Sequence, residues 1–128
     1  MAFYPSEFIY CKKTRSRGRG VFARVAITEG TVVETVPVLV LPTKDLYGPT
    51  KTSLLGQYAF YWNENSVALA LGYGSLYNHS YTPNLACTDI APQTKRFTAI
   101  RDIEQEEELT FNYGGSSDSA DPVKFEVT

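Results

Sequence analysis

The residues best suited to chemistry gather in one polar stretch, residues 74–84, which holds the only histidine of the 128-residue chain. Asn78, His79 and Ser80 are followed by Pro83 and Asn84. Short polar side chains and proline favour turns over the interiors of helices and strands. Apolar segments flank this turn, so its buried donors and acceptors need partners. We expect those partners to be protein backbone or a ligand.

The two cysteines, Cys11 and Cys87, are the other candidates for chemistry. Two cysteines and one histidine do not form a zinc site at the usual spacings, so we expect no metal. A nucleophilic pair would need one thiol beside His79, and nothing in the local sequence indicates this. Reduced, partly buried thiols are the favoured interpretation, and a disulfide stays open.

Gly18 and Gly20 precede an apolar segment and form a third candidate site. Glycine lacks a Cβ, so backbone at these positions can approach a ligand closely. A plain glycine turn between two strands is the alternative interpretation.

The elements that must position these residues are short strands, because no stretch shows a sustained helical period. Segments rich in valine, threonine and aromatic residues alternate with turn residues, which predicts an all-β or mostly β domain. Pro37 should place part of its strand at an edge or a bend, and residues 42–53 read as a loop with at most one helical turn. The expected strands are residues 7–12, 20–25, 31–41, 54–62, 67–71, 85–90, 96–100 and 108–112.

Length and composition indicate one domain with one core. No apolar run is long enough to span a membrane, and the first residues lack the features of a signal peptide, so we expect an intracellular protein. The formal net charge is −2; half of the basic residues precede Val25 and eight of the fourteen acidic residues follow Arg101. This balance argues against a dedicated nucleic-acid binder and favours a cationic protein substrate.

Three motifs together resemble the SET domain family. They are residues 17–23 (Arg-Gly-Arg-Gly-Val-Phe-Ala), residues 78–84 (Asn-His-Ser-Tyr-Thr-Pro-Asn), and residues 99–103 with residues 107–114 (Glu-Glu-Leu-Thr-Phe-Asn-Tyr-Gly). The resemblance covers residues 7–115 of a single domain, residues 1–128, and leaves residues 116–128 as a polar tail. It implies a fold of small curved sheets, with the last motif threaded beside the second as a C-terminal pseudoknot.

The resemblance also implies an activity, protein-lysine N-methylation with S-adenosylmethionine as donor and S-adenosylhomocysteine as product. By resemblance, Gly18, Arg19 and Gly20 contact the methionine end of the cofactor. Asn78 and His79 would hold its amine and adenine.

Tyr113 is the catalytic residue that the resemblance indicates, and it would also contact the cofactor. Phe111, Tyr61 and Phe125 are the expected walls of the substrate channel, with Phe125 folding back from the tail. Asn112 departs from the family pattern, which usually has aspartate there. Phenylalanine at position 111 removes a hydroxyl that the family uses to limit methylation, so we expect di- or trimethyl product.

The expected partner is a basic protein or peptide that carries the target lysine, with a histone among the possibilities. A homodimer is possible, and neither nucleic acid nor a membrane is expected as a direct partner. The expected location is the cytoplasm or nucleus of a host, and a secreted effector stays open. The alternatives are a SET-like binding or scaffold module without catalysis, and a homodimeric structural protein.

Overall fold

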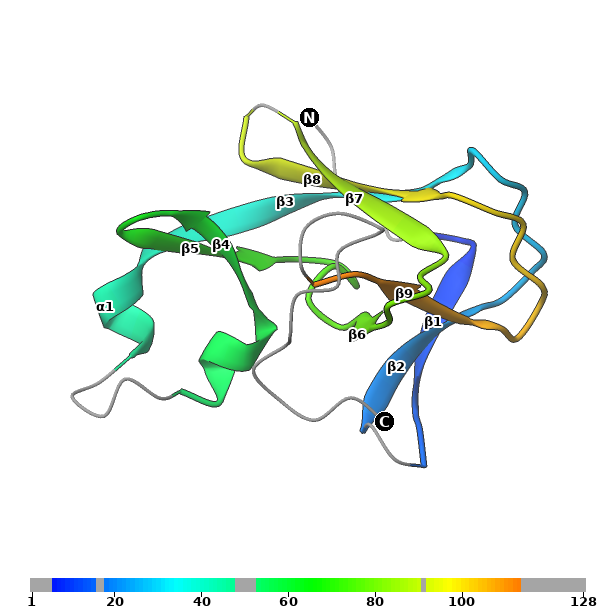
Figure 1. The fold of residues 1–128 in the computed structure, drawn as a ribbon, viewed down its shortest axis with the longest axis horizontal. Coiled ribbons are helices and arrows are strands. Elements are labelled where there is room, and N and C mark those ends of the chain that lie inside the picture. The colour runs from blue at the N-terminus through cyan, green and yellow to red at the C-terminus, as the bar shows by residue number, and fades with distance from the viewer. Residues whose placement is uncertain (1–5, 16–17, 48–52, 91, 114–128) are drawn as a thin grey trace.

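The computed structural model describes residues 6–15, 18–47, 53–90 and 92–113. Most of these residues lie in strands of two sheets (Figure 1), which confirms the mostly β prediction. The smaller sheet has the strand order β1-β2-β9-β6. Its members are β1 (Ile9–Lys13), β2 (Arg19–Ala23), β9 (Glu108–Phe111) and β6 (Asn78–His79).

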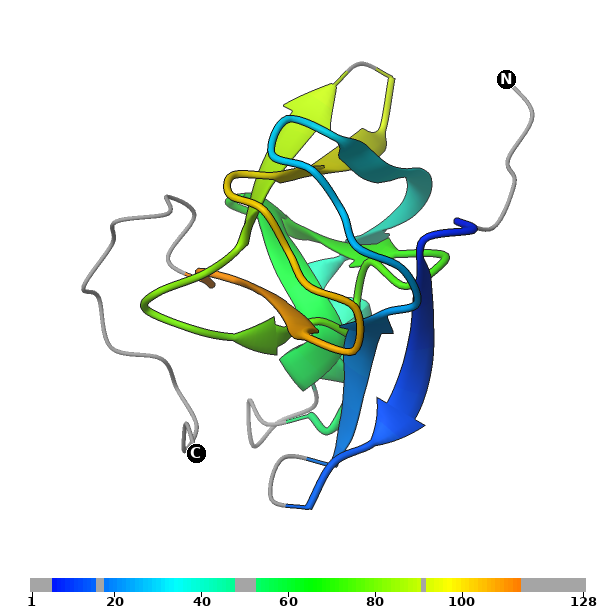
Figure 2. The same cartoon turned by 90° about the vertical axis from the view of Figure 1, so that its right-hand side faces the viewer.

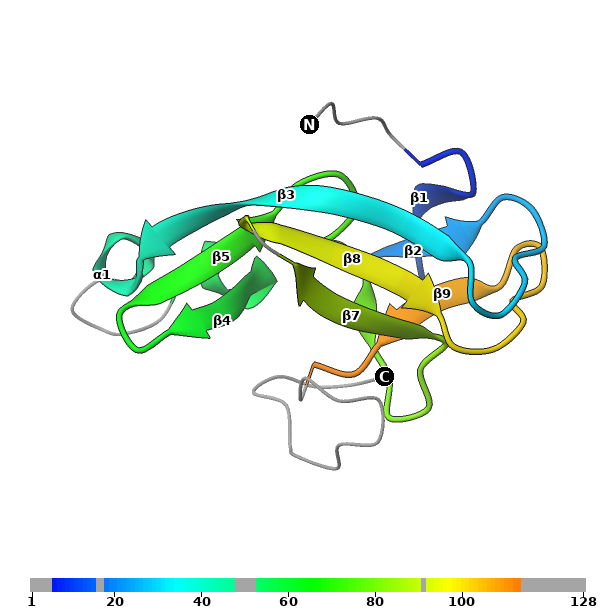
Figure 3. The same ribbon diagram turned by 90° about the horizontal axis from the view of Figure 1, so that it is seen from above.

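The larger sheet has the order β4-β5-β3-β8-β7, and β3 runs along its whole length (Figure 3). Two short helical turns lie between β3 and β4. The elements are β3 (Val32–Pro42), α1 (Thr43–Leu46), the 3-10 turn η1 (Leu55–Tyr58), β4 (Ala59–Asn63), β5 (Ser66–Ala70), β7 (Leu85–Ile90) and β8 (Thr94–Ala99).

Pro37 marks the point at which β3 changes its partner. The residues from Val32 to Pro37 pair with β8, and those from Val38 onward pair with β5. Proline has no N–H to donate to a ladder, and its carbonyl accepts a bond from the Leu71 amide at 3.1 Å. The strand therefore continues through Pro37, because proline lies where the pairing changes.

The expected strand over residues 54–62 is wrong in its first half. Residues Leu55–Tyr58 form η1, and β4 begins at Ala59. Ser53 Oγ accepts the Gly56 amide at 3.1 Å, and the Tyr47 hydroxyl donates to the Gly56 carbonyl at 3.4 Å. A Cβ at Gly56 would lie 2.5 Å from the Tyr47 hydroxyl. Local side-chain bonds and this close ring contact therefore favour a turn over an extended chain.

One hydrophobic core joins the two sheets, and its side chains come from strands far apart in sequence. Val36 from β3 and Phe97 from β8 are fully buried, as are Ile9, Val21 and Leu109 from the smaller sheet. Burial of each such side chain contributes about 1.5–3 kcal/mol. The last motif thus enters the core directly, through Leu109.

The second and last motifs lie side by side. β6 pairs in parallel with β9, with Asn78 opposite Thr110 and His79 opposite Phe111, and the two strands are adjacent in the second view (Figure 2). The sequence predicted only a polar turn at Asn78–His79. Pairing with a strand distant in sequence overrides that local preference, and this placement agrees with the expected position of the pseudoknot.

Asn84 stabilises this pairing of β6 with β9, which is called the joint below. It is 1% exposed, and its Nδ2 donates to the Glu108 carbonyl at 2.8 Å and to Glu107 Oε2 at 3.1 Å. Its Oδ1 accepts the Thr110 amide at 2.9 Å. One buried side chain therefore satisfies two main-chain groups of β9, as buried polar groups require.

Replacing Asn84 tests this joint. Asn84→Ala leaves the Glu108 carbonyl and the Thr110 amide buried without this partner, so the free energy of unfolding should fall by about 3 kcal/mol. Urea denaturation measures the loss. Asn63→Ala removes an exposed turn asparagine and should cost less than about 1 kcal/mol. Equal losses in the two variants would contradict the assigned role.

Candidate active site

The first and second motifs meet beside β2, where Asn78 lies against Arg19 and Gly20; Gly18, Arg19, Gly20 and Asn78 are called the cradle below. Gly18 has φ +70°, a left-handed conformation that favours glycine. The Arg19 carbonyl accepts a hydrogen bond from Asn78 Nδ2 at 3.3 Å. A Cβ at Gly20 would lie 3.1 Å from Asn78 Nδ2 and 2.7 Å from Glu108 Oε2. The structure therefore brings together four of the predicted cofactor residues, and glycine at position 20 lets the side chains of Asn78 and Glu108 lie against β2.

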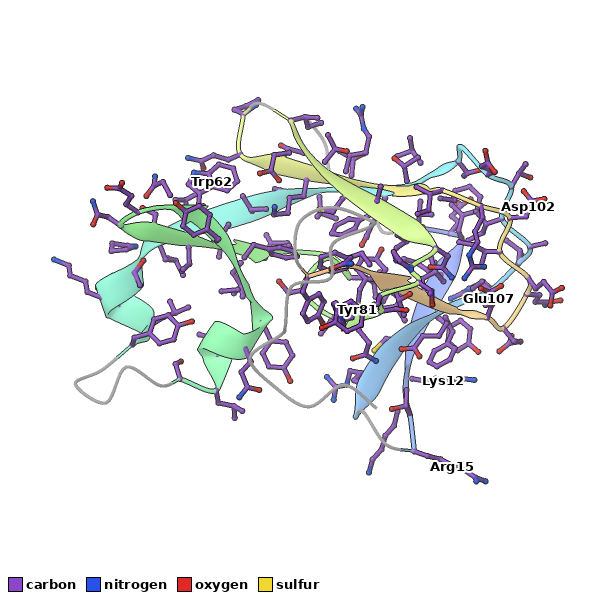
Figure 4. The ribbon with its side chains drawn as sticks, viewed as in Figure 1. Lys12, Arg15, Trp62, Tyr81, Asp102 and Glu107 are labelled. Atoms are coloured by element: carbon purple, nitrogen blue, oxygen red, sulfur yellow. The ribbon has the colours of Figure 1, made fainter. Side chains whose placement is uncertain are left out.

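Tyr113 is fixed at both ends, by His79 of the second motif and by Tyr77 just before that motif. Its amide donates to His79 Nδ1 at 2.9 Å, and its hydroxyl donates to the Tyr77 carbonyl. The His79 and Tyr113 rings lie 5.2 Å apart at 65°, and Tyr81, labelled in Figure 4, packs edge-on against His79 at 4.3 Å. The pairing of the two motifs thus sets the orientation of the predicted catalytic residue.

His79 is 2% exposed, so it offers little surface to a ligand. Its ring accepts the Tyr113 amide, which assigns it a role in holding the last motif. The cofactor contact expected for His79 stays a prediction.

Phe111 belongs to an aromatic cluster beside Tyr113. The ring of Phe111 lies 4.9 Å from Tyr113 and stacks on Phe60 at 5.5 Å. Phe97 and Tyr77 complete the cluster at 5.8 and 6.3 Å from Phe111. These five residues, Phe60, Tyr77, Phe97, Phe111 and Tyr113, are the aromatic cluster below.

Two other predicted channel residues are not part of this cluster. Tyr61 is 75% exposed and points to the opposite face of β4 from Phe60, because neighbouring side chains of a strand alternate. The sequence could not decide between these faces, since a shift of one residue exchanges them. Phe125 lies outside the described residues, as does the whole polar tail.

A buried glutamate supports the cluster, and sequence reasoning missed it. Glu34 is 6% exposed, and its Oε1 accepts the Tyr77 hydroxyl at 2.6 Å while Oε2 accepts the Tyr73 amide at 3.4 Å. Burial raises the pKa of Glu34 despite these two donors. Burial and the neighbouring carboxyl also raise the pKa of Tyr77 well above its usual value. The sequence signal that could have indicated a buried carboxyl is the position of this glutamate within the valine-rich β3.

Lys95 is a second buried charge that the sequence did not reveal. It is 4% exposed, and its Nζ lies 2.5 Å from Asp89 Oδ1. The same ammonium lies 4.4 Å from the Phe60 ring and 5.9 Å from the Trp62 ring; Trp62 is labelled on β4 in Figure 4. Cation–π attraction therefore also holds the Phe60 ring in place.

The two cysteines show no sign of activation. Both thiols are free. Burial raises the pKa of Cys87 to about 11, and burial also raises the pKa of Cys11. The thiolate is the reactive form, so the structure gives no support to a cysteine nucleophile.

Among the described residues, no group of three or more histidine, cysteine, aspartate or glutamate side chains is placed to hold a metal ion. Among the same residues, no helix is long and apolar enough to cross a membrane.

Comparison with known proteins supports the resemblance stated above. The family model of the SET domain matches residues 18–114. A histone-lysine N-methyltransferase of Schizosaccharomyces pombe, specific for lysine 37 of histone H3, is 34% identical over 104 residues. That match covers 80% of this chain and 71% of the relative.

Solved structures agree on the fold. A Plasmodium falciparum protein described as a candidate histone methyltransferase is 28% identical, with a TM-score of 0.67, over 89% of this chain and 97% of that one. A chain of a humanized Chaetomium thermophilum Polycomb Repressive Complex 2 bound to the inhibitor GSK126 has the same TM-score at 22% identity. It matches over 85% of this chain and 15% of its own length, and shows the fold alone.

The chain belongs to the SET domain family. It is a protein-lysine N-methyltransferase, and enzymes of this family generally use S-adenosylmethionine.

The contact between Tyr77 and Glu34 predicts a pH-dependent loss of stability. Because burial places the pKa of Glu34 above its unfolded value, its ionisation weakens the fold as pH rises through the folded pKa. Tyr77→Phe removes a donor to the carboxylate and raises that pKa further. Urea denaturation should therefore show a small loss at pH 4, where Glu34 is mostly protonated, and a loss of about 1–3 kcal/mol at pH 7.

The control for this variant is Tyr58→Phe, which removes a hydroxyl from a tyrosine that is 47% exposed. It should change stability little at either pH. A Tyr77→Phe loss that is the same at both pH values would contradict the assigned contact.

Proposed function

We propose that the chain binds S-adenosylmethionine in the cradle of Gly18, Arg19, Gly20 and Asn78, with Tyr113 at its inner end. The observation that carries this proposal is that all three motifs converge there, through the bonds of Asn78 to Arg19 and of Tyr113 to His79. The residues fit the cofactor. Beyond its chain neighbours, no atom of the described residues lies within 4 Å of the position that a Cβ would take at Gly18, so a ligand can approach the backbone there, and carboxylate and amide oxygens suit an ammonium group. The bound cofactor supplies an electrophilic methyl group on a sulfonium.

Tyr113 aligns the reacting groups. Its hydroxyl donates its proton to the Tyr77 carbonyl, so the phenol oxygen can accept weak contacts from the methyl group and the substrate amine. Methyl transfer needs nitrogen, carbon and sulfur in line, and holding reactants in such a geometry supplies much of the rate enhancement. Tyr113 is therefore placed to orient the two reactants.

The aromatic cluster favours the neutral form of the substrate lysine, which is the nucleophile. Free lysine titrates at about 10.4, so only roughly a few in ten thousand side chains are neutral at pH 7. An apolar wall formed by Phe111, which is 7% exposed, disfavours the ammonium form, and a neighbouring sulfonium disfavours it further. Phe111 thus lines the channel in this proposal, with Phe60 behind it.

The substrate is a basic protein, and we favour a histone. The similar protein of Schizosaccharomyces pombe is named for lysine 37 of histone H3, and the similar protein of Plasmodium falciparum is described as a candidate histone methyltransferase. The surface also offers an exposed carboxylate at Glu106, which attracts basic segments. A histone substrate places the enzyme in the nucleus or the cytoplasm. A binding module without catalysis is the alternative, and the intact setting of Tyr113 argues against it.

Calorimetric titration with S-adenosylhomocysteine tests the cofactor site. Wild-type protein should bind it, and Asn78→Ala should weaken binding by about tenfold or more, because the amine loses its acceptor. Asn63→Ala, on an exposed turn, is the matched control and should bind as wild type. Full affinity in Asn78→Ala would exclude this residue from the site.

Phe111→Tyr tests the channel. The added hydroxyl takes space beside Tyr113, whose ring lies 4.9 Å away, and it can hold a water there. Mass spectrometry of the modified lysine should show a shift from di- and trimethyl product toward monomethyl product. An unchanged ratio of products would remove Phe111 from the channel.

A further inference from the structure

The side-chain amide of Asn78 has a fixed direction, and a neighbouring carboxylate fixes it. Asn78 Nδ2 donates to Glu108 Oε2 at 2.6 Å and to the Arg19 carbonyl at 3.3 Å. At neutral pH a carboxylate and a carbonyl can only accept hydrogen bonds. The NH₂ group of Asn78 must therefore face them, and Oδ1 must point the other way.

Oδ1 of Asn78 is left as an acceptor. Within the described part of the chain, the hydrogen bonds of the Asn78 side chain are the two made by Nδ2. The residue is only half-buried, so a ligand can reach it. A carbonyl oxygen in this position prefers a donor, and an ammonium is the strongest donor that the proposed cofactor carries.

Glu108 is well placed for this task because two elements hold it. It is the first residue of β9, it pairs with Phe22 of β2, and its carbonyl accepts a bond from Asn84 Nδ2. Its backbone is therefore anchored to the joint between the motifs, while its carboxylate reaches the cradle. The bond from Asn84 to the Glu108 carbonyl stabilises the joint, and the bond from Asn78 to the Glu108 carboxylate orients a side chain of the cradle. Glu108 therefore takes part in both.

We infer that Glu108 is a positioning residue that selects a cofactor with an α-ammonium group, by holding the Asn78 amide with its oxygen toward the ligand. This inference rests on the proposed cofactor site. Glu108 acts through Asn78, because its carboxylate accepts the Asn78 NH₂ group and so sets the direction of Oδ1. Glycine at position 20 is part of the arrangement, because a Cβ there would meet Glu108 Oε2 at 2.7 Å and Asn78 Nδ2 at 3.1 Å.

The test uses two ligands that differ in one group, S-adenosylhomocysteine and its analogue without the α-amino group. Both are titrated by calorimetry into wild type, Glu108→Gln and Glu104→Gln. Glutamine has the shape of glutamate, but its NH₂ group can also donate a hydrogen bond to Asn78 Oδ1. The Asn78 amide can then rotate so that its oxygen no longer faces the ligand. Glu104→Gln makes the same change of charge at an exposed position in the preceding turn, and is the matched control.

Glu108→Gln should weaken binding of S-adenosylhomocysteine by about tenfold or more, the loss expected for a charge-assisted hydrogen bond. Its affinity for the deaminated analogue should stay within about twofold of wild type, as that ligand makes no ammonium contact. Glu104→Gln should match wild type with both ligands. Glu108→Gln should also add no further loss when combined with Asn78→Ala, since it acts through that residue.

Gly20→Ala provides a second variant. Its Cβ displaces the flexible end of Glu108, so it should also weaken the ammonium ligand more than the deaminated one.

Three results would overturn the inference. Equal loss of both ligands in Glu108→Gln would show a general structural role, and unchanged affinity for both would show no role. An additive loss in the combined variant would show that Glu108 acts independently of Asn78. If wild type binds neither ligand, the proposed cofactor site itself is wrong. If wild type binds S-adenosylhomocysteine and only the results for Glu108→Gln differ from those expected, the inference about Glu108 is wrong and the proposed cofactor site is still supported.

Discussion

The structure depends on one joint, the parallel pairing of β6 with β9 and its closure by Asn84. Two residues of each strand face each other, and the pairing brings polar main chain into the interior of the protein. Asn84 satisfies the Glu108 carbonyl and the Thr110 amide, which would otherwise be costly to bury. Short polar side chains in this turn are therefore required for a structural reason before any chemistry is considered.

The same joint builds the site, because the side chains of β9 serve different tasks. Leu109 enters the core, while Glu108 reaches the cradle and Phe111 joins the aromatic cluster. Immediately after β9, Tyr113 is held by His79 and by the Tyr77 carbonyl. Any shift of β9 against β6 would move the proposed cofactor cradle and the proposed channel together. The proposed catalytic geometry and the stability of the fold thus share the same hydrogen bonds.

Much of this could be predicted from the sequence, and the failures have physical causes. Alternating valine, threonine and aromatic residues predicted the strands, and three motifs predicted which segments would meet. The short strand at Asn78–His79 was missed because its stability comes from a partner far along the chain. The faces of the strand that holds Tyr61 could not be told apart, because this needs the register, and its place in the channel stays a prediction. The contacts of Glu34, Lys95 and Glu108 depend on tertiary packing, which charge patterns alone do not indicate.

These contacts assemble an enzyme that methylates lysine, which is the central claim. The most direct test incubates core histones with S-adenosylmethionine and the protein, and locates added methyl groups by mass spectrometry. We predict methylation at one or a few lysine side chains with wild type, and its loss with Tyr113→Phe, in which the cradle and the fold should remain. Methylation of equal extent with Tyr113→Phe would contradict the assigned role of Tyr113. No methylation of histones or of any other basic protein, by wild type that binds S-adenosylhomocysteine, would contradict the central claim and indicate a binding module.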